Sequence, residues 1–109
     1  MMDGGDLFAG ECDPEHELVI DHFPFVIGRD EGCDYQADYP SISRRHCRLY
    51  LAGNMVWLQD LESRNGTFLN GQRVNTPRIV QDGDMLSLSL HFFRIVLNSS
   101  RVSRLPFGR

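Results

Sequence analysis

Three short segments of the 109-residue chain combine arginine, serine, asparagine and glycine in a way that could bind an anion. They are residues 27–30 (Ile-Gly-Arg-Asp), 41–48 (Ser-Ile-Ser-Arg-Arg-His-Cys-Arg) and 60–67 (Asp-Leu-Glu-Ser-Arg-Asn-Gly-Thr). Guanidinium groups make forked, charge-assisted hydrogen bonds to phosphate or carboxylate, and hydroxyl and loop amide groups add further donors. Each segment alone is weak evidence, because Gly-Arg is common and Asn-Gly is usually a turn. Together the three segments predict an oxyanion-binding site.

The sequence between and around these three segments has the pattern of β-strands. Short runs rich in Val, Ile, Phe, Tyr and Leu recur between Gly, Asp, Asn and Pro, and no stretch has the period of a long amphipathic helix. This spacing is typical of an all-β sandwich. We expect strands at residues 18–20, 23–27, 33–36, 47–51, 55–60, 67–69, 72–74, 78–80, 84–89 and 92–97.

Turn signals and alternating leucines support the strand assignment. Asn70-Gly71 and Asp82-Gly83 are dipeptides typical of β-hairpins. Leu86, Leu88 and Leu90 alternate with other residues, as in a half-buried strand. Each of the three polar segments lies in a loop or at the end of an expected strand, so a sandwich could bring them together.

Composition narrows the class of protein. Apolar residues are 41% and charged residues 24%, as in soluble globular domains, and no apolar run is long enough for a membrane helix. The first 17 residues have neither the basic nor the apolar region of a signal peptide. Three cysteines without CxxC spacing disfavour a disulfide framework or a zinc site, so we expect a cytoplasmic protein without a metal. The net charge of −4 argues against generic binding to nucleic acid.

Charge is unevenly distributed along the chain, and the distribution suggests how the chain divides into a domain and two tails. Residues 1–21 contain seven acidic residues and no arginine, whereas every basic residue of the chain is an arginine further along. We expect residues 1–15 to form a flexible acidic tail, residues 16–98 a single β-sandwich domain, and residues 99–109 a C-terminal linker or tail.

In order and spacing, the motifs resemble those of the forkhead-associated (FHA) domain family. The matching residues, all within 18–97, are Gly28-Arg29, Ser43-x-x-His46, Asn65-Gly66-Thr67, Asn70-Gly71 and Asp82-Gly83-Asp84. The resemblance implies a β-sandwich of about eleven mostly antiparallel strands, with recognition loops at one end that bind phosphothreonine peptides. It implies a binding module and not an enzyme, with no cofactor and no catalytic residue.

The resemblance also implies a role for each matching residue. Arg29 and Ser43 would contact the phosphate, and the side-chain amide of Asn65 would hold the main chain of the peptide. Two further arginines beside these motifs, Arg44 and Arg64, are expected to contact phosphate or peptide.

Structural support of the site is expected from three other residues. His46 would make hydrogen bonds that order the loop carrying Ser43. Gly28 and Gly66 would supply backbone freedom or close approach.

These observations predict a phosphothreonine-recognition module that mediates phosphorylation-dependent protein–protein interaction, as part of a larger signalling protein. The alternative is a phospho-independent scaffold or assembly domain. The ligand is expected in trans, because Thr67 and Thr76 are the only threonines and both belong to the expected fold. We expect a monomer that binds neither nucleic acid nor membrane.

Overall fold

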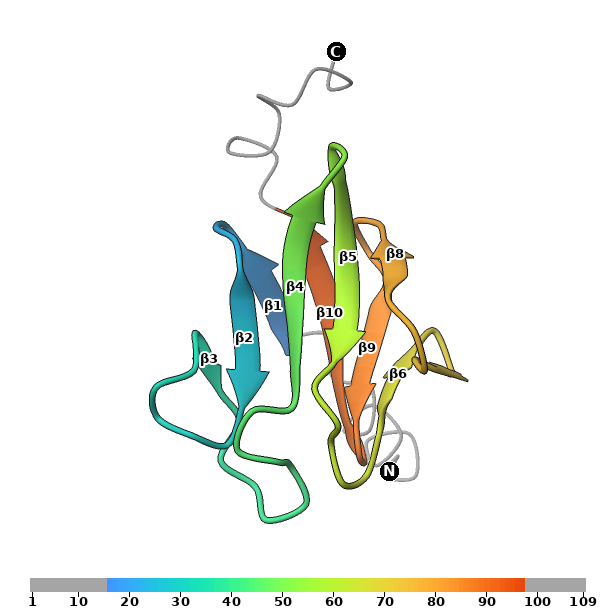
Figure 1. The fold of residues 1–109 in the computed structure, drawn as a ribbon. Coiled ribbons are helices and arrows are strands. Elements are labelled where there is room, and N and C mark those ends of the chain that lie inside the picture. Colours follow the sequence, from blue (N-terminus) through green and yellow to red (C-terminus); the bar gives the residue numbers. More distant parts are fainter. Residues whose placement is uncertain (1–15, 98–109) are drawn as a thin grey trace, which may run out of the picture.

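The computed structural model describes residues 16–97, and they form ten strands in two five-stranded sheets that face each other (Figure 1). The strands are β1 (Glu17–Ile20), β2 (Phe25–Gly28), β3 (Tyr35–Gln36), β4 (Cys47–Ala52), β5 (Met55–Asp60), β6 (Thr67–Leu69), β7 (Gln72–Arg73), β8 (Arg78–Val80), β9 (Met85–Leu88) and β10 (His91–Leu97). The all-β sandwich is confirmed, with ten described strands where the resemblance implied about eleven. The expected tails, residues 1–15 and 99–109, lie outside the described residues.

The two sheets have the strand orders β1-β10-β9-β6-β7 and β3-β2-β4-β5-β8. β1 pairs in parallel with β10 and β3 with β2, while the other pairs are antiparallel. Burial alternates along the strands, so that Leu49 and Leu58, which are register partners, both face the core. The apolar side chains between the sheets form one continuous cluster, which fixes the register of each strand.

Two local expectations are wrong. Asp82-Gly83 is not a hairpin turn, because β8 and β9 belong to different sheets and the turn carries the chain between them. Leu90 does not continue the buried face of Leu86 and Leu88, and its exposed fraction is 83%. The reason is that β9 ends at Leu88 and the next residue has a φ of 59°, which turns the chain toward β10.

The topology brings the three polar segments to the same end of the sandwich. β2 ends at Gly28, β4 begins at Cys47, β5 ends at Asp60 and β6 begins at Thr67. The loops β2–β3, β3–β4 and β5–β6 therefore lie together at the lower end of Figure 1. Residues 16–97 contain no helix long and apolar enough to cross a membrane.

Candidate functional site

The end of β2 is joined to the β3–β4 loop by main-chain hydrogen bonds. The Arg29 N–H donates to the carbonyl of Ser43 at 2.9 Å, and the Asp30 N–H donates to that of Arg44 at 3.1 Å. A Cβ at Gly28 would collide with the carbonyl oxygen of Arg44, so this approach of two backbones requires glycine. The structure therefore places Arg29 directly beside Ser43.

The side chain of Arg29 is half-buried and oriented by the same loop. Its Nε donates to the carbonyl of Ile42 at 2.9 Å. Its two terminal nitrogens make no hydrogen bond with any residue between 16 and 97. A guanidinium fixed through Nε, with both terminal nitrogens unused, is suited to forked binding of an anion.

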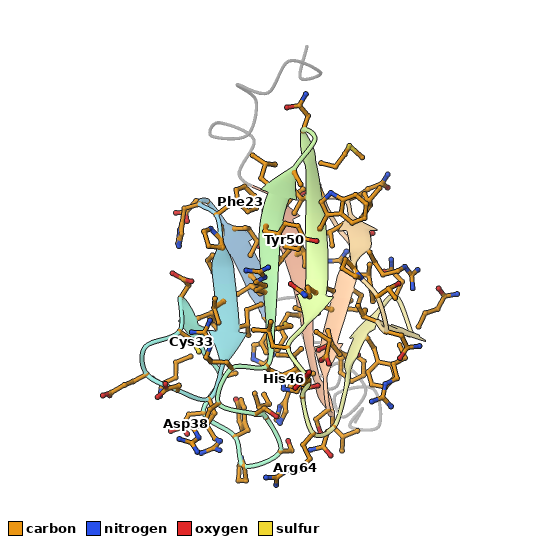
Figure 2. All side chains as sticks on the ribbon, in the orientation of Figure 1. Phe23, Cys33, Asp38, His46, Tyr50 and Arg64 are labelled. Carbon is orange, nitrogen blue, oxygen red and sulfur yellow. The ribbon has the colours of Figure 1, made fainter. Side chains whose placement is uncertain are left out.

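His46 links the β3–β4 loop to the β5–β6 loop. The Ser43 N–H donates to Nδ1 of His46 at 3.1 Å, and Nε2 donates to the carbonyl of Gly66 at 2.9 Å. The side chain is completely buried, and burial lowers its pKa below 6.5, so the imidazole is neutral with its proton assigned to Nε2. In Figure 2, His46 lies at the start of β4, above the loop that carries Arg64.

Two further hydrogen bonds join the same loops near their tips. The Arg64 N–H donates to the hydroxyl oxygen of Ser43 at 3.0 Å, and the side-chain amide of Asn65 donates to the carbonyl of Ser41 at 2.7 Å. Within the described residues, the hydroxyl hydrogen of Ser43 and the Oδ1 of Asn65 have no partner. Ser43 is thus oriented with its hydroxyl hydrogen available to donate. Asn65 is oriented with Oδ1 available to accept and a second amide hydrogen available to donate.

Asp60 shapes the β5–β6 loop, and we did not predict its role. Its carboxylate accepts hydrogen bonds from the Ser63 N–H at 3.1 Å and from the hydroxyls of Ser63 and Thr67 at 2.6 Å each. Partial burial raises the pKa of Asp60, but these hydrogen bonds outweigh it, and the pKa lies below its usual value of 3.8. The Ser63 hydroxyl in turn accepts from the Gly66 N–H at 3.0 Å. An acid three residues before a serine is the sequence signal that could have identified this turn.

The remaining candidates lie at the rim of the same loop cluster. The side chains of Arg44 and Arg64 are exposed and make no hydrogen bond or ion pair within residues 16–97. Gly66 adopts a φ of 93°, which is the backbone freedom expected of it. The structure also brings a residue that we did not predict, Arg73 of β7, against Gly66. No cluster of metal-ligating residues occurs in the described part of the chain.

The sequence and the fold of this chain are similar to those of known proteins. The family model of the FHA domain matches residues 25–89, so the chain belongs to the FHA domain family. FHA domains are binding modules. Mouse "Proliferation marker protein Ki-67" is 30% identical over 78 residues, which cover 67% of this chain and 2% of that protein. The chain thus spans a very small part of this curated relative.

Solved FHA structures share the fold. A chain from a study of phosphothreonine-dependent FHA domain interactions is 29% identical, with a TM-score of 0.61, over 67% of this chain and 75% of that one. The N-terminal FHA domain of Rad53p from S. cerevisiae was solved in complex with a phosphothreonine peptide. It is 33% identical, with a TM-score of 0.53, over 57% of this chain and 52% of that one.

Proposed function

We propose that this chain is a phosphothreonine-peptide recognition module. Arg29 and Ser43 hold the phosphate, Arg44 and Arg64 add positive charge around it, and Asn65 holds the main chain of the peptide. The observation that carries this proposal is the set of hydrogen bonds that fixes these residues in one loop cluster while leaving donors unused. The phosphothreonine peptide bound to the Rad53p domain supports the same choice of ligand.

The relatives and the sequence support three further parts of the proposal, a longer parent protein, a ligand in trans and a reducing compartment. The matched relative is a much longer protein, which supports a module within a larger signalling protein. The positions of the two threonines, Thr67 in β6 and Thr76 between β7 and β8, support a ligand that binds in trans. The two cysteines in the described part of the chain, Cys33 and Cys47, are free thiols, which suits the reducing cytoplasm.

Isothermal titration calorimetry tests the proposal directly. A phosphothreonine peptide selected from a degenerate library should bind with a free energy of about −8 kcal/mol, which is micromolar affinity, because the interface is small. The unphosphorylated twin of that peptide should show no measurable binding, since clustered guanidinium groups then lack their dianion. Equal binding of the two peptides would overturn the proposal and favour the scaffold alternative.

A further inference from the structure

The chain contains two Asn-Gly dipeptides, Asn65-Gly66 and Asn70-Gly71, on either side of β6. Asparagine before glycine is prone to deamidation, because the glycine has no Cβ to shield its nitrogen. That nitrogen attacks the asparagine Cγ, so that a ring closes as the Cγ–Nδ2 bond breaks, and ammonia leaves with the glycine N–H proton. Water then opens the ring to aspartate or isoaspartate. The side chain of Asn65 is exposed, so its chemistry takes place in contact with water.

Both reacting groups of Asn65-Gly66 are engaged in other hydrogen bonds. The Gly66 N–H donates to the Ser63 hydroxyl at 3.0 Å, and the side-chain amide of Asn65 donates to the carbonyl of Ser41 at 2.7 Å. The Gly66 carbonyl is also fixed, because it accepts from His46 at 2.9 Å. Ring closure requires the nitrogen to lose its proton and the side chain to turn toward it, so both the Ser63 and the Ser41 bonds must break first.

The Ser63 hydroxyl is itself held by Asp60. It donates to Oδ1 of Asp60 at 2.6 Å, and the same carboxylate accepts from the Ser63 N–H at 3.1 Å. Because its hydrogen points to Asp60, the hydroxyl presents a lone pair to the Gly66 N–H. The pKa of Asp60 lies below 3.8, which makes its carboxylate a weak base. This chain of bonds therefore retains the Gly66 proton and does not remove it.

Asn70-Gly71 provides a comparison within the same chain. The Oδ1 of Asn70 accepts from the Met85 N–H at 2.9 Å, so this side chain is also oriented. The Gly71 N–H, however, makes no hydrogen bond with residues 16–97, and the space around a Cβ at Gly71 is open. At this dipeptide only the side chain is engaged, and the attacking nitrogen is free.

We propose that the Asp60–Ser63 pair protects Asn65 from deamidation and so sets how long the candidate site keeps its asparagine. The protection concerns the chemistry of residues 65 and 66 alone, whereas its consequence for binding rests on the proposed function. A carboxylate at position 65 loses the donor to the Ser41 carbonyl. It also adds a negative charge to a site proposed to hold a phosphate, so conversion should end phosphopeptide binding.

Peptide mapping tests the protection. Trypsin cleaves after arginine, so both asparagines fall in one fragment, residues 65–73. The protein is incubated at mildly alkaline pH and physiological temperature and is then digested, and fragmentation mass spectrometry assigns the deamidation to each asparagine. A synthetic peptide of residues 65–73 with an acetylated N-terminus gives the rates without the fold. The proteins are the unmodified chain, Ser63→Ala, and the control Ser63→Thr, which keeps a hydroxyl. Melting temperatures verify folding.

We expect comparable rates at the two asparagines in the peptide but not in the protein. A hydrogen bond that must break slows the reaction about twofold to tenfold, so Asn65 should react roughly tenfold to a hundredfold more slowly in the unmodified chain than in the peptide, and more slowly than Asn70. Ser63→Ala should accelerate the reaction at Asn65 by about twofold to tenfold without changing Asn70, and Ser63→Thr should retain the protection.

Four outcomes would overturn the protection. They are equal rates at Asn65 in the folded chain and the peptide, an unchanged or lower rate in Ser63→Ala, equal acceleration of both asparagines in that variant, and a Ser63→Thr chain that reacts as fast as Ser63→Ala.

Calorimetric titration of aged samples tests the consequence for binding. The fraction of binding-competent protein should fall in step with the fraction of intact Asn65, and binding that survives full conversion would refute this consequence. If no phosphothreonine peptide binds the fresh chain, the proposed function fails, while the rates at Asn65 still decide the protection.

Discussion

Replacing His46 with alanine should release the β3–β4 and β5–β6 loops from each other. The change removes hydrogen bonds of 3.1 and 2.9 Å and leaves the Ser43 N–H and the Gly66 carbonyl without their partner. Each buried polar group left unsatisfied costs about 1–3 kcal/mol, so two such groups cost about 2–6 kcal/mol. Water can reach loop groups near the rim once the ring is gone. We therefore expect the free energy of unfolding to fall by about 3 kcal/mol, near the lower end of that range. The total free energy of unfolding of a small domain is roughly 5–15 kcal/mol.

The assay is thermal unfolding followed by circular dichroism, together with calorimetric titration of the selected phosphopeptide. A loss of about 3 kcal/mol should lower the melting temperature by roughly 10–20 °C in a domain of this size. His22→Ala is the matched control. His22 also makes two hydrogen bonds, with Asp21 at 2.8 Å and Asp34 at 2.9 Å, but its side chain is 51% exposed. If the His46 variant melts no lower than the His22 variant, the bridging role of His46 is refuted.

The pH dependence of stability provides a second measurement on the same residue. Burial holds the pKa of folded His46 below the ordinary 6.5, so between the folded and ordinary values the unfolded chain binds more protons. The contribution of His46 to the free energy of unfolding should fall as pH drops below 6.5 and should level off below the folded pKa. His22 acts in the opposite direction, because hydrogen bonds to Asp34 and Asp21 raise its pKa. The measurement therefore belongs in the His22→Ala background, where a further His46→Ala change should flatten the slope.

Three further outcomes are expected. Arg29→Ala should abolish measurable phosphopeptide binding, because it removes two charge-assisted hydrogen bonds to the phosphate of about 1.5–3 kcal/mol each. It should lower the free energy of unfolding by only about 1 kcal/mol, for the lost bond to Ile42. A calorimetric affinity within about twofold of the unmodified chain would contradict the assignment. Gly28→Ala should lower both melting temperature and affinity, because its Cβ collides with the backbone of Arg44, whereas Gly32→Ala, with open space around it, should change neither. A phosphoserine peptide should bind about fivefold more weakly than its phosphothreonine counterpart, because one buried methyl group contributes about 1 kcal/mol. Equal affinities of the two peptides in calorimetric titration would exclude a pocket for the methyl group.

Most strands were predictable because their period of two is a local property. β5 was expected at 55–60 and β6 at 67–69, and both occur with those bounds. Other bounds shift by one or two residues, as for β2, expected at 23–27 and observed at Phe25–Gly28. Where β2 and β3 begin and end depends on pairing with neighbouring strands, which a residue pattern does not encode.

The wrong expectations concern which sheet a strand joins. A dipeptide such as Asp82-Gly83 indicates that the chain turns, and it does turn, with a φ of 92° at Gly83. Whether the next strand pairs with the previous one depends on contacts far away in sequence, here of β8 with β5 and of β9 with β10 and β6. Leu90 was misplaced for a related reason, since its alternation with Leu88 continues past the point where the strand ends.

The motif residues of the candidate site could be named from the sequence because type, order and spacing resemble those of a known family. Arg73 could not, because its relation to the site depends on the register of β6 with β7 and on the direction of a long side chain over Phe68. The carboxylate of Asp60 had a local signal in its spacing from Ser63, but its bond to Thr67 depends on where β6 begins.

The geometry of the loops also indicates how a small site could bind with useful affinity. Each of the three ligand-binding side chains is already held by a hydrogen bond. The Ser43 hydroxyl accepts from the Arg64 N–H, the Asn65 amide donates to the carbonyl of Ser41, and Arg29 donates to the carbonyl of Ile42. A ligand that meets oriented groups avoids most of the ordering cost, which otherwise reaches about 0.5–1.5 kcal/mol for each flexible side chain. Orientation here depends on bonds between loops more than on the sheets, so a change at the buried base of the loops should weaken binding without touching the ligand. In variants of His46, affinity and loop stability should therefore fall together. In variants of Arg29, affinity should fall while loop stability changes little.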